Sequence, residues 1–300
     1  MPEDGSPMLA NLAALGAALC WAAGGLIAIT PVREIGSVAF NRIRMVIVFA
    51  MLGLAATVTG GWAQLSLEQA AWLALSGAVG VFLGDSALFW ALGRLGPRRN
   101  VVIYASNAPM TALLGWLVLG ESLAPLTLLG IVLVTAGVML AVALRGGSHD
   151  WEAVRGSLLA GVGACLIAAL CQAGGSILAK PALTTGADPT AAAAVRVGAS
   201  GLLLWAGTLL PGERRALTAA LRPRILVLIA ANGLLGLGLG MTLLMIGLKY
   251  GNAGVAATLS ATSPVLILPM LWVLTRQAPR LGAWIGAALA VAGVMLIVNR

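Results

Sequence analysis

Five residues, Ala-Gly-Val-Met-Leu, occur twice in the sequence, at positions 136–140 and 292–296, each time inside an apolar run. Trp116 and Trp272 each stand twenty positions before their copy, so the two copies are 156 residues apart. A repeat at about half the length of the chain indicates two copies of one structural unit. In a strongly apolar sequence this is typical of a membrane transporter, in which two pseudo-symmetric halves enclose a site.

The composition excludes a soluble globular domain. Hydrophobic residues make up 60% of the chain, charged residues 9%, and the mean hydropathy is +1.00, whereas about a quarter of residues carry charge in soluble domains. The net charge of +8 would fit nucleic-acid binding. The basic residues are instead scattered in short loops between apolar runs, so we expect a lipid bilayer and no nucleic acid as partner. Cys20, Cys165 and Cys171 lie in apolar runs, where we expect packing and no metal or other cofactor.

Apolar runs long enough to cross a bilayer, about 20 residues each, are separated by charged and Pro/Gly-rich breaks. The prolines and glycines of these breaks predict turns, at Pro31, Gly96-Pro97, Pro125, Pro181, Pro211-Gly212 and Pro279. The ten predicted runs are 8–29, 37–58, 69–92, 99–120, 125–144, 156–179, 188–210, 224–248, 252–275 and 280–298. The polar stretch 145–155 joins two halves, 1–150 and 151–300, with five runs each. Because five is odd, the second half must cross the membrane in the opposite sense. The sequence therefore predicts an all-α membrane protein of ten helices, built as an inverted five-plus-five repeat around a central cavity.

The distribution of basic residues predicts the orientation in the membrane. Loops at one face hold twelve arginines, whereas the opposite face holds only Lys180, Lys249 and Arg300. Cytoplasmic loops carry the excess of Lys and Arg. We therefore expect the arginine-rich loops in the cytoplasm and both termini outside it, in a bacterial-type inner (plasma) membrane.

Three stretches of the first half and their order are specific enough to suggest a family. They are Gly84-Asp85 through Ala91-Leu92, then Pro109, then Leu119-Gly120-Glu121 before a fifth run that ends in Ala-Gly-Val-Met-Leu. With Trp21 and Arg44 in the first two runs, nearly the whole chain resembles the EamA-type permeases of the drug/metabolite transporter superfamily. The resemblance implies a ten-helix fold and export or exchange of small metabolites such as amino acids. The second half departs from the pattern, because Thr275-Arg276-Gln277 stands where a Gly-Glu pair is usual.

Four charged residues lie inside the predicted spans, where charge is costly and usually faces the bundle interior or a partner. They are Arg42, Arg44, Asp85 and Arg196. Counted from their loops at 1.5 Å per residue, Arg44 and Asp85 lie at a similar depth below the same membrane face, so we expect an ion pair. The pair either fixes two helices against each other or makes Asp85 a proton-coupling carboxylate. Arg42, nearer its loop, is expected to reach the interface.

Arg196 occupies the position of Arg44 in the second half, but that half offers it no matching acid, because the counterpart of Asp85 is Met241. Three partners are open to Arg196. It can bind backbone carbonyls, pair with Asp85 across the repeat, or receive a carboxylate of the substrate.

Pro109 and Pro264 lie near the middles of the fourth and ninth runs. Each proline removes a backbone donor and frees the carbonyl four residues earlier. Polar residues surround both, namely Tyr104, Ser106 and Asn107 in the first half and Thr262 and Ser263 in the second. Freed carbonyls and hydroxyl groups at midplane depth predict a substrate-binding site. The alternative is a packing kink, which explains the prolines but not the polar residues.

Trp21 and Gln172 occupy equivalent positions in the first and sixth runs. Tryptophan is more usual at membrane interfaces. Trp21 in mid-span therefore predicts either a core residue or a wall of the cavity, and Gln172 would line the same cavity from the second half.

These features favour a secondary transporter that moves small amphipathic metabolites, amino acids first, by alternating access. A multidrug or other organic-solute efflux permease of the same fold is the alternative. No Walker A pattern is present, and no H-E-x-x-H or G-x-S-x-G pattern supports an enzyme. A single chain with two halves is sufficient as a monomer, and a dimer stays open.

Overall fold

The computed structural model describes residues 6–144, 156–207, 213–276 and 280–298, and within them the regular structure is entirely helical. The predicted link 145–155 lies outside the described residues. Nine stretches of the described chain are long and apolar enough to cross a membrane. The predicted run 188–210 corresponds to α8 (Pro189–Ala206), which is not among these nine. The described chain thus gives nine candidate spans, and the tenth stays a prediction.

The first half runs from α1 to α6. Its elements are α1 (Ser6–Ile35), α2 (Ser37–Val58), a short 3-10 turn η1 (Gly61–Gln64), α3 (Leu67–Gly77), a π-helical segment η2 (Ala78–Leu83), α4 (Gly84–Tyr104), α5 (Asn107–Leu119) and α6 (Pro125–Ala143). Capping residues mark some of the starts. Ser66 and Gln69 form a reciprocal capping box at the start of α3, which satisfies two of its free backbone donors.

The second half repeats this order. Its elements are α7 (Leu158–Thr184), α8 (Pro189–Ala206), α9 (Glu213–Ala220), α10 (Pro223–Gly233), a π-helical segment η4 (Leu234–Gly240), α11 (Met241–Tyr250), α12 (Ala253–Ser260), α13 (Ser263–Thr275) and α14 (Leu281–Val298). Asp188 caps α8 by accepting hydrogen bonds from the N–H groups of Thr190 and Ala191, both at 2.9 Å.

Not every proline predicted as a turn ends a helix. Pro31 lies inside α1 and Pro181 inside α7, each within about one turn of the end. A proline blocks a single helical hydrogen bond, and a helix in a membrane protein tolerates this where the freed groups find other partners. The turn predicted at Gly96-Pro97 is likewise not observed, because α4 continues through it to Tyr104, although the candidate spans on its two sides still end at Leu92 and begin at Arg99.

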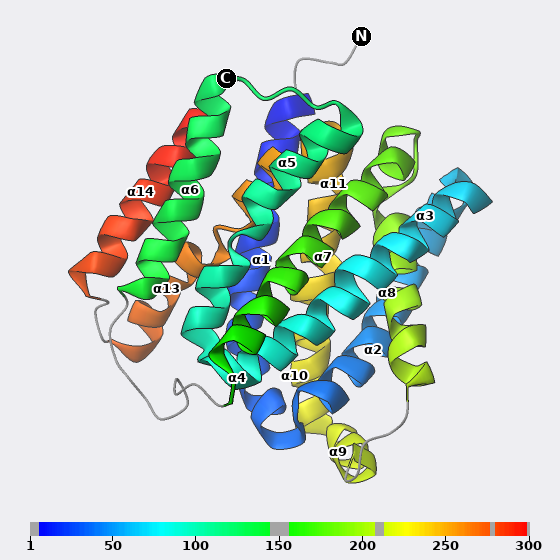
Figure 1. The fold of residues 1–300 in the computed structure, drawn as a ribbon. Coiled ribbons are helices and arrows are strands. Elements are labelled where there is room, and N and C mark those ends of the chain that lie inside the picture. Colours follow the sequence, from blue (N-terminus) through cyan, green and yellow to red (C-terminus); the bar gives the residue numbers. More distant parts are fainter. Residues whose placement is uncertain (1–5, 145–155, 208–212, 277–279, 299–300) are drawn as a thin grey trace.

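The two halves pack with swapped partners. Helix α4 of the first half packs against α7 of the second half. In the same way α11, the counterpart of α4 in the second half, packs against α1, the counterpart of α7 in the first half. The last helices of the halves, α6 and α14, pack against each other along their length, at one side of the molecule (Figure 1). The chain enters α1 and leaves α14 at the same end of the bundle (Figure 1).

Glycines at the contact between α6 and α14 show how the two helices are oriented. A Cβ atom on Gly137 would lie 2.7 Å from the carbonyl oxygen of Gly286, and a Cβ on Gly286 would lie 2.7 Å from that of Gly137. Gly130, early in α6, approaches Gly293, late in α14, in the same way. The two helices are therefore antiparallel and in backbone contact. Since they carry the repeated sequence, the last helix of the second half is inverted relative to its counterpart.

Candidate functional site

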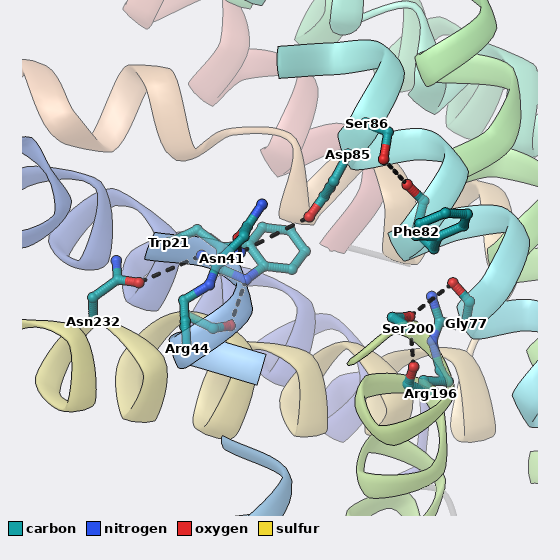
Figure 2. A network of polar contacts seen from close by, with 11 residues as sticks. Trp21, Asn41, Arg44, Gly77, Phe82, Asp85, Ser86, Arg196, Ser200 and Asn232 are labelled. Carbon is teal, nitrogen blue, oxygen red and sulfur yellow. Dashed lines mark hydrogen bonds and ion pairs between the residues drawn. The ribbon is translucent and has the colours of Figure 1, made fainter. Parts of the chain in front are cut away.

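An arginine and an aspartate meet inside the bundle, between α2 and the first turn of α4. Arg44 Nη2 lies 3.9 Å from Asp85 Oδ2, which is ion-pair distance but too long for a hydrogen bond. The Arg44 side chain is 13% exposed and that of Asp85 27%. Figure 2 shows Asp85 directed toward Arg44. Both charges are thus in the apolar part of the chain and partly accessible.

The guanidinium of Arg44 is held in place by two asparagines. Its Nη2 donates to Asn41 Oδ1, one turn earlier on α2, and its Nη1 donates to Asn232 Oδ1 of α10 at 3.4 Å. The group also lies over the ring of Phe40, 5.2 Å from the ring centroid. The remaining donor, Nε, is buried and has no hydrogen-bond partner. Arg44 is therefore fixed in position without using all its donors.

Asp85 contrasts with Arg44 because its carboxylate is scarcely held at all. Within the described chain its polar contact is the ion pair with Arg44, and no described residue donates a hydrogen bond to it. A carboxylate in an apolar environment normally accepts several hydrogen bonds. The oxygens of Asp85 therefore have capacity left for a donor that is not part of the protein.

Two hydrogen bonds between the halves complete this network. Asn232 Nδ2 donates to the carbonyl of Gly24 in α1 at 2.8 Å, and Trp21 Nε1 donates to the carbonyl of Gly236 at 2.8 Å. Gly236 lies in η4, so α10 and η4 of the second half are joined to α1 and α2 of the first. The site around Arg44 (Figure 2) therefore draws on both halves.

The π-helical segments precede equivalent positions in the two halves. The segment η2 ends immediately before Gly84-Asp85, and η4 ends at Gly240, immediately before Met241. A π segment shifts one carbonyl out of the regular ladder, and such segments are frequent at functional sites. The Trp21 hydrogen bond is accepted by a carbonyl inside such a segment, at Gly236 of η4. The sequence does not predict these segments, because their residues are ordinary helix-compatible apolar residues and glycine.

Arg196 of α8 is placed differently from Arg44 although it occupies the same position in the repeat. Its side chain is 0% exposed. Its Nη1 donates to the carbonyl of Gly175 at 3.3 Å and lies 3.9 Å from Met245 Sδ, while Nε and Nη2 are buried without a hydrogen-bond partner. Of the three predicted partners, the structure shows a backbone carbonyl. Within the described residues Arg196 forms no ion pair with Asp85.

Small residues of neighbouring helices close the surroundings of Arg196. A Cβ atom on Gly77 would lie 2.4 Å from the Arg196 carbonyl oxygen, and one on Gly80 would lie 3.3 Å from Nη2. Ser200 Oγ, one turn later on α8, donates to the carbonyl of Gly77 at 3.0 Å. The guanidinium is therefore sealed between α8 and the α3–η2 segment in this conformation.

The helix breaks that were predicted to hold the substrate are present, but their polar side chains bind their own backbone. In the first half Ser106 Oγ donates to Ile103 O and Asn107 Nδ2 to Tyr104 O, both at 2.7 Å. These bonds cap the end of α4 before α5 begins, and Pro109 lies in the first turn of α5. Side chains of this kind commonly replace backbone partners where a helix is interrupted.

The second break has the same chemistry. Thr262 Oγ1 donates to Leu259 O at 2.7 Å, and Ser263 Oγ donates to Ser260 O at 2.9 Å. The carbonyl of Ser260 is the one that Pro264 frees, so a side chain of the break satisfies it. At both breaks, polar side chains thus bind backbone carbonyls of the helix that ends there, and a role for them in binding stays a prediction. Gln172 of α7 is partly buried, and none of the hydrogen bonds described involves its side chain.

A second buried ion pair joins the halves at the end of the bundle. Glu121 Oε1 lies 2.9 Å from Lys180 Nζ, and its two oxygens accept the N–H of Ala253, the first residue of α12, at 3.1 and 2.9 Å. Lys180 also donates to the carbonyl of Gly251. The sequence does not predict this contact, because it depends on how the loop after α5 meets α7 and the start of α12 in the folded bundle.

Comparisons with known proteins agree with this architecture. The sequence profile of the EamA-like transporter family matches residues 8–143 and 159–299. A solved crystal structure, described only as that of a protein, is similar over 96% of this chain and 95% of its own, with a TM-score of 0.74 and 21% identity. At that identity the likeness concerns the fold. None of the curated proteins compared with the chain matches it.

Proposed function

Because the chain belongs to the EamA-like transporter family, we propose that it is a secondary transporter of small amphipathic metabolites, amino acids first, working by alternating access. The observation that carries the proposal is the partly accessible Arg44–Asp85 pair in the interior, 3.9 Å apart and bound by groups of both halves. Charged residues inside a bilayer mark substrate or ion pathways.

The balance of intramembrane charge favours substrates that carry a carboxylate. Arg42, Arg44 and Arg196 stand in the apolar helices with one acid, Asp85. A site for organic cations would be expected to offer acidic residues in excess. The sequence shows no nucleotide-binding pattern, so an ion or substrate gradient would drive transport.

Counterflow in proteoliposomes tests this proposal. Purified protein is reconstituted, loaded with one unlabelled amino acid at a time, and supplied with the labelled form outside, with and without a pH gradient. We expect accumulation of label for a subset of amino acids, absent from protein-free vesicles. Accumulation only with organic cations would support the multidrug alternative and overturn the amino-acid proposal.

We further propose that the chain resides in the plasma membrane as a self-sufficient monomer with its arginine-rich loops in the cytoplasm. By the loop assignment made from the sequence, Arg99 and Arg222 fall on the side predicted to be cytoplasmic, and Lys180 and Lys249 on the other. Single cysteines introduced into these loops of a cysteine-free variant should react with a membrane-impermeant maleimide in whole cells only on the lysine side. Labelling of the arginine side alone would reverse the orientation.

A further inference from the structure

We infer that Arg44 and Asp85 together form a clamp for a zwitterion, in which Arg44 receives the α-carboxylate of an amino acid and Asp85 its α-ammonium group. The inference rests on the proposed function and assigns the substrate groups to particular side chains. It places the carboxylate on Arg44 and not on Arg196, whose guanidinium is 0% exposed and sealed by Gly77 and Gly80.

Both members of the pair have unmet hydrogen-bonding capacity. An ionised carboxylate accepts up to about four hydrogen bonds, yet no described residue donates one to Asp85, whose side chain is 27% exposed. Arg44 has five N–H donors; two of them donate to Asn41 and Asn232, and its partly exposed side chain keeps donor capacity beside these bonds. A zwitterionic substrate supplies the missing partners at once, because it brings three ammonium donors and two carboxylate oxygens on a single carbon atom.

The two side chains of the pair are farther apart than those of a closed ion pair. A structural ion pair closes to hydrogen-bond contact, as Glu121 and Lys180 do at 2.9 Å in the same molecule. Arg44 and Asp85 stay at 3.9 Å. They are close enough to offset each other's charge before substrate binds. At this distance they form no hydrogen bond with each other, so both keep hydrogen-bonding groups for a substrate.

The cationic side of the clamp is held in place by residues of both halves. Asn41 and Asn232 fix the two terminal nitrogens of Arg44, and Asn232 is itself fixed by its bond to Gly24. Holding a binding group in place beforehand reduces the entropy lost when substrate binds. It also couples substrate on Arg44 to the position of α10 in the other half, where alternating access requires movement.

The test compares three ligands that share one side chain and differ in the groups of the clamp. With the leucine side chain, the three ligands are leucine itself, isoamylamine, which lacks the carboxylate, and isocaproate, which lacks the amine. If another amino acid is transported best in the counterflow panel, that amino acid and its two analogues are used in place of these. Each competes unlabelled against counterflow of the labelled amino acid. For the wild-type protein we expect the amino acid to compete at concentrations at least about tenfold lower than either analogue, since it gains a charged hydrogen bond on both sides.

Variants assign the two sides of the clamp. In Asp85→Asn the advantage of the amino acid over its deaminated analogue should fall at least about tenfold, and in Arg44→Gln its advantage over the decarboxylated analogue should fall similarly. Arg44→Lys keeps the positive charge and should restore part of the preference. The control is Lys180→Gln, which removes a charge from the other ion pair and should weaken all three competitors alike.

The outcomes separate the two proposals. Without counterflow of any amino acid in the wild type, the proposed function fails and takes the clamp with it. If counterflow occurs but an analogue competes as well as the amino acid, the clamp alone is wrong. Equal weakening of all competitors in Asp85→Asn and Arg44→Gln would also overturn it, and would assign Asp85 to folding or proton coupling. A variant that does not fold leaves the wild-type comparison to decide.

Discussion

Arg44 and Arg196 occupy the same position in the two halves, yet their surroundings give them different chemistry. Arg44 has an acid within 3.9 Å and part of its surface exposed. Arg196 has a carbonyl and a thioether as neighbours and no exposed surface. One difference between the halves lies in the neighbouring span, where Asp85 in the first half is matched by Met241 in the second.

At the scale of the residue, Arg196→Met should be tolerated and should unfold at an equal or higher temperature than the wild type. Replacing a buried, incompletely bonded charge by an apolar side chain of similar volume is often neutral or stabilising, by about 1–4 kcal/mol. Arg196→Ala is the matched control. It also removes the charge but leaves a cavity, which costs about 2–5 kcal/mol. Thermal unfolding of both variants in detergent measures the difference, and equal losses would show that the charge itself stabilises the fold.

The positions of some residues of the site could be predicted from the sequence, and those of others could not. The helical rise alone placed Arg44 and Asp85 at one depth, because that estimate needs only the distance of each residue from its loop. The surroundings of Arg196 were out of reach, since they depend on the crossing of α8 with α3 and η2 at Gly77 and Gly80. The polar residues beside Pro109 and Pro264 were interpreted as free for substrate, but their hydrogen bonds depend on the local geometry of each break.

At the scale of the element, backbone contact between α6 and α14 requires glycine at matched positions.

Another pair of counterparts shows that a helix end keeps its shape when its sequence changes. Gly120 ends α5 with φ 66°, and Arg276, its counterpart, ends α13 with φ 54°. The left-handed conformation is unfavourable for arginine, so the surrounding chain imposes it. The sequence showed that the Gly-Glu pair is missing here, but not that the backbone keeps the same turn.

Gly286→Ala should destabilise the protein by about 1–3 kcal/mol, the usual cost of overpacking. The added Cβ would lie 2.2 Å from Ala141 N and 2.7 Å from Gly137 O, both backbone atoms of the opposite helix. Gly163→Ala is the control, because a Cβ at that position of α7 meets nothing within 4 Å. It should leave the unfolding temperature unchanged or raise it, through better helix propensity. Similar shifts for the two variants would argue against close contact of α6 and α14.

At the scale of the whole molecule, the duplicated sequence and the swapped packing of the halves describe one arrangement. The 156-residue period predicted two units, and the antiparallel approach of Gly130 to Gly293 and of Gly137 to Gly286 shows the inversion at α6 and α14. Side-chain contacts between the two halves were not predictable, because nothing in either half alone specifies them. Glu121 and Lys180 are the clearest case.

Breaking the Glu121–Lys180 pair should lower the stability of the assembled halves. Both side chains are largely buried, 10% and 13% exposed, and removing one partner of such a pair costs about 3–5 kcal/mol. Lys180→Met should therefore unfold well below the wild-type temperature. Adding Glu121→Gln to it should recover part of the loss, because no unpaired carboxylate then remains. A double-mutant cycle of unfolding measures the coupling, and strictly additive losses would contradict a direct interaction.

The antiparallel contact of α6 with α14 is of the kind that two separate, identical subunits would make about a twofold axis. In such a dimer every substitution would be present twice, and an aspartate at position 85 would bring a second aspartate in place of Met241. Joining both units in one polypeptide removes that restriction. An acid in one half and a thioether in the other then make the two halves chemically different at this position, which a dimer of identical subunits cannot achieve.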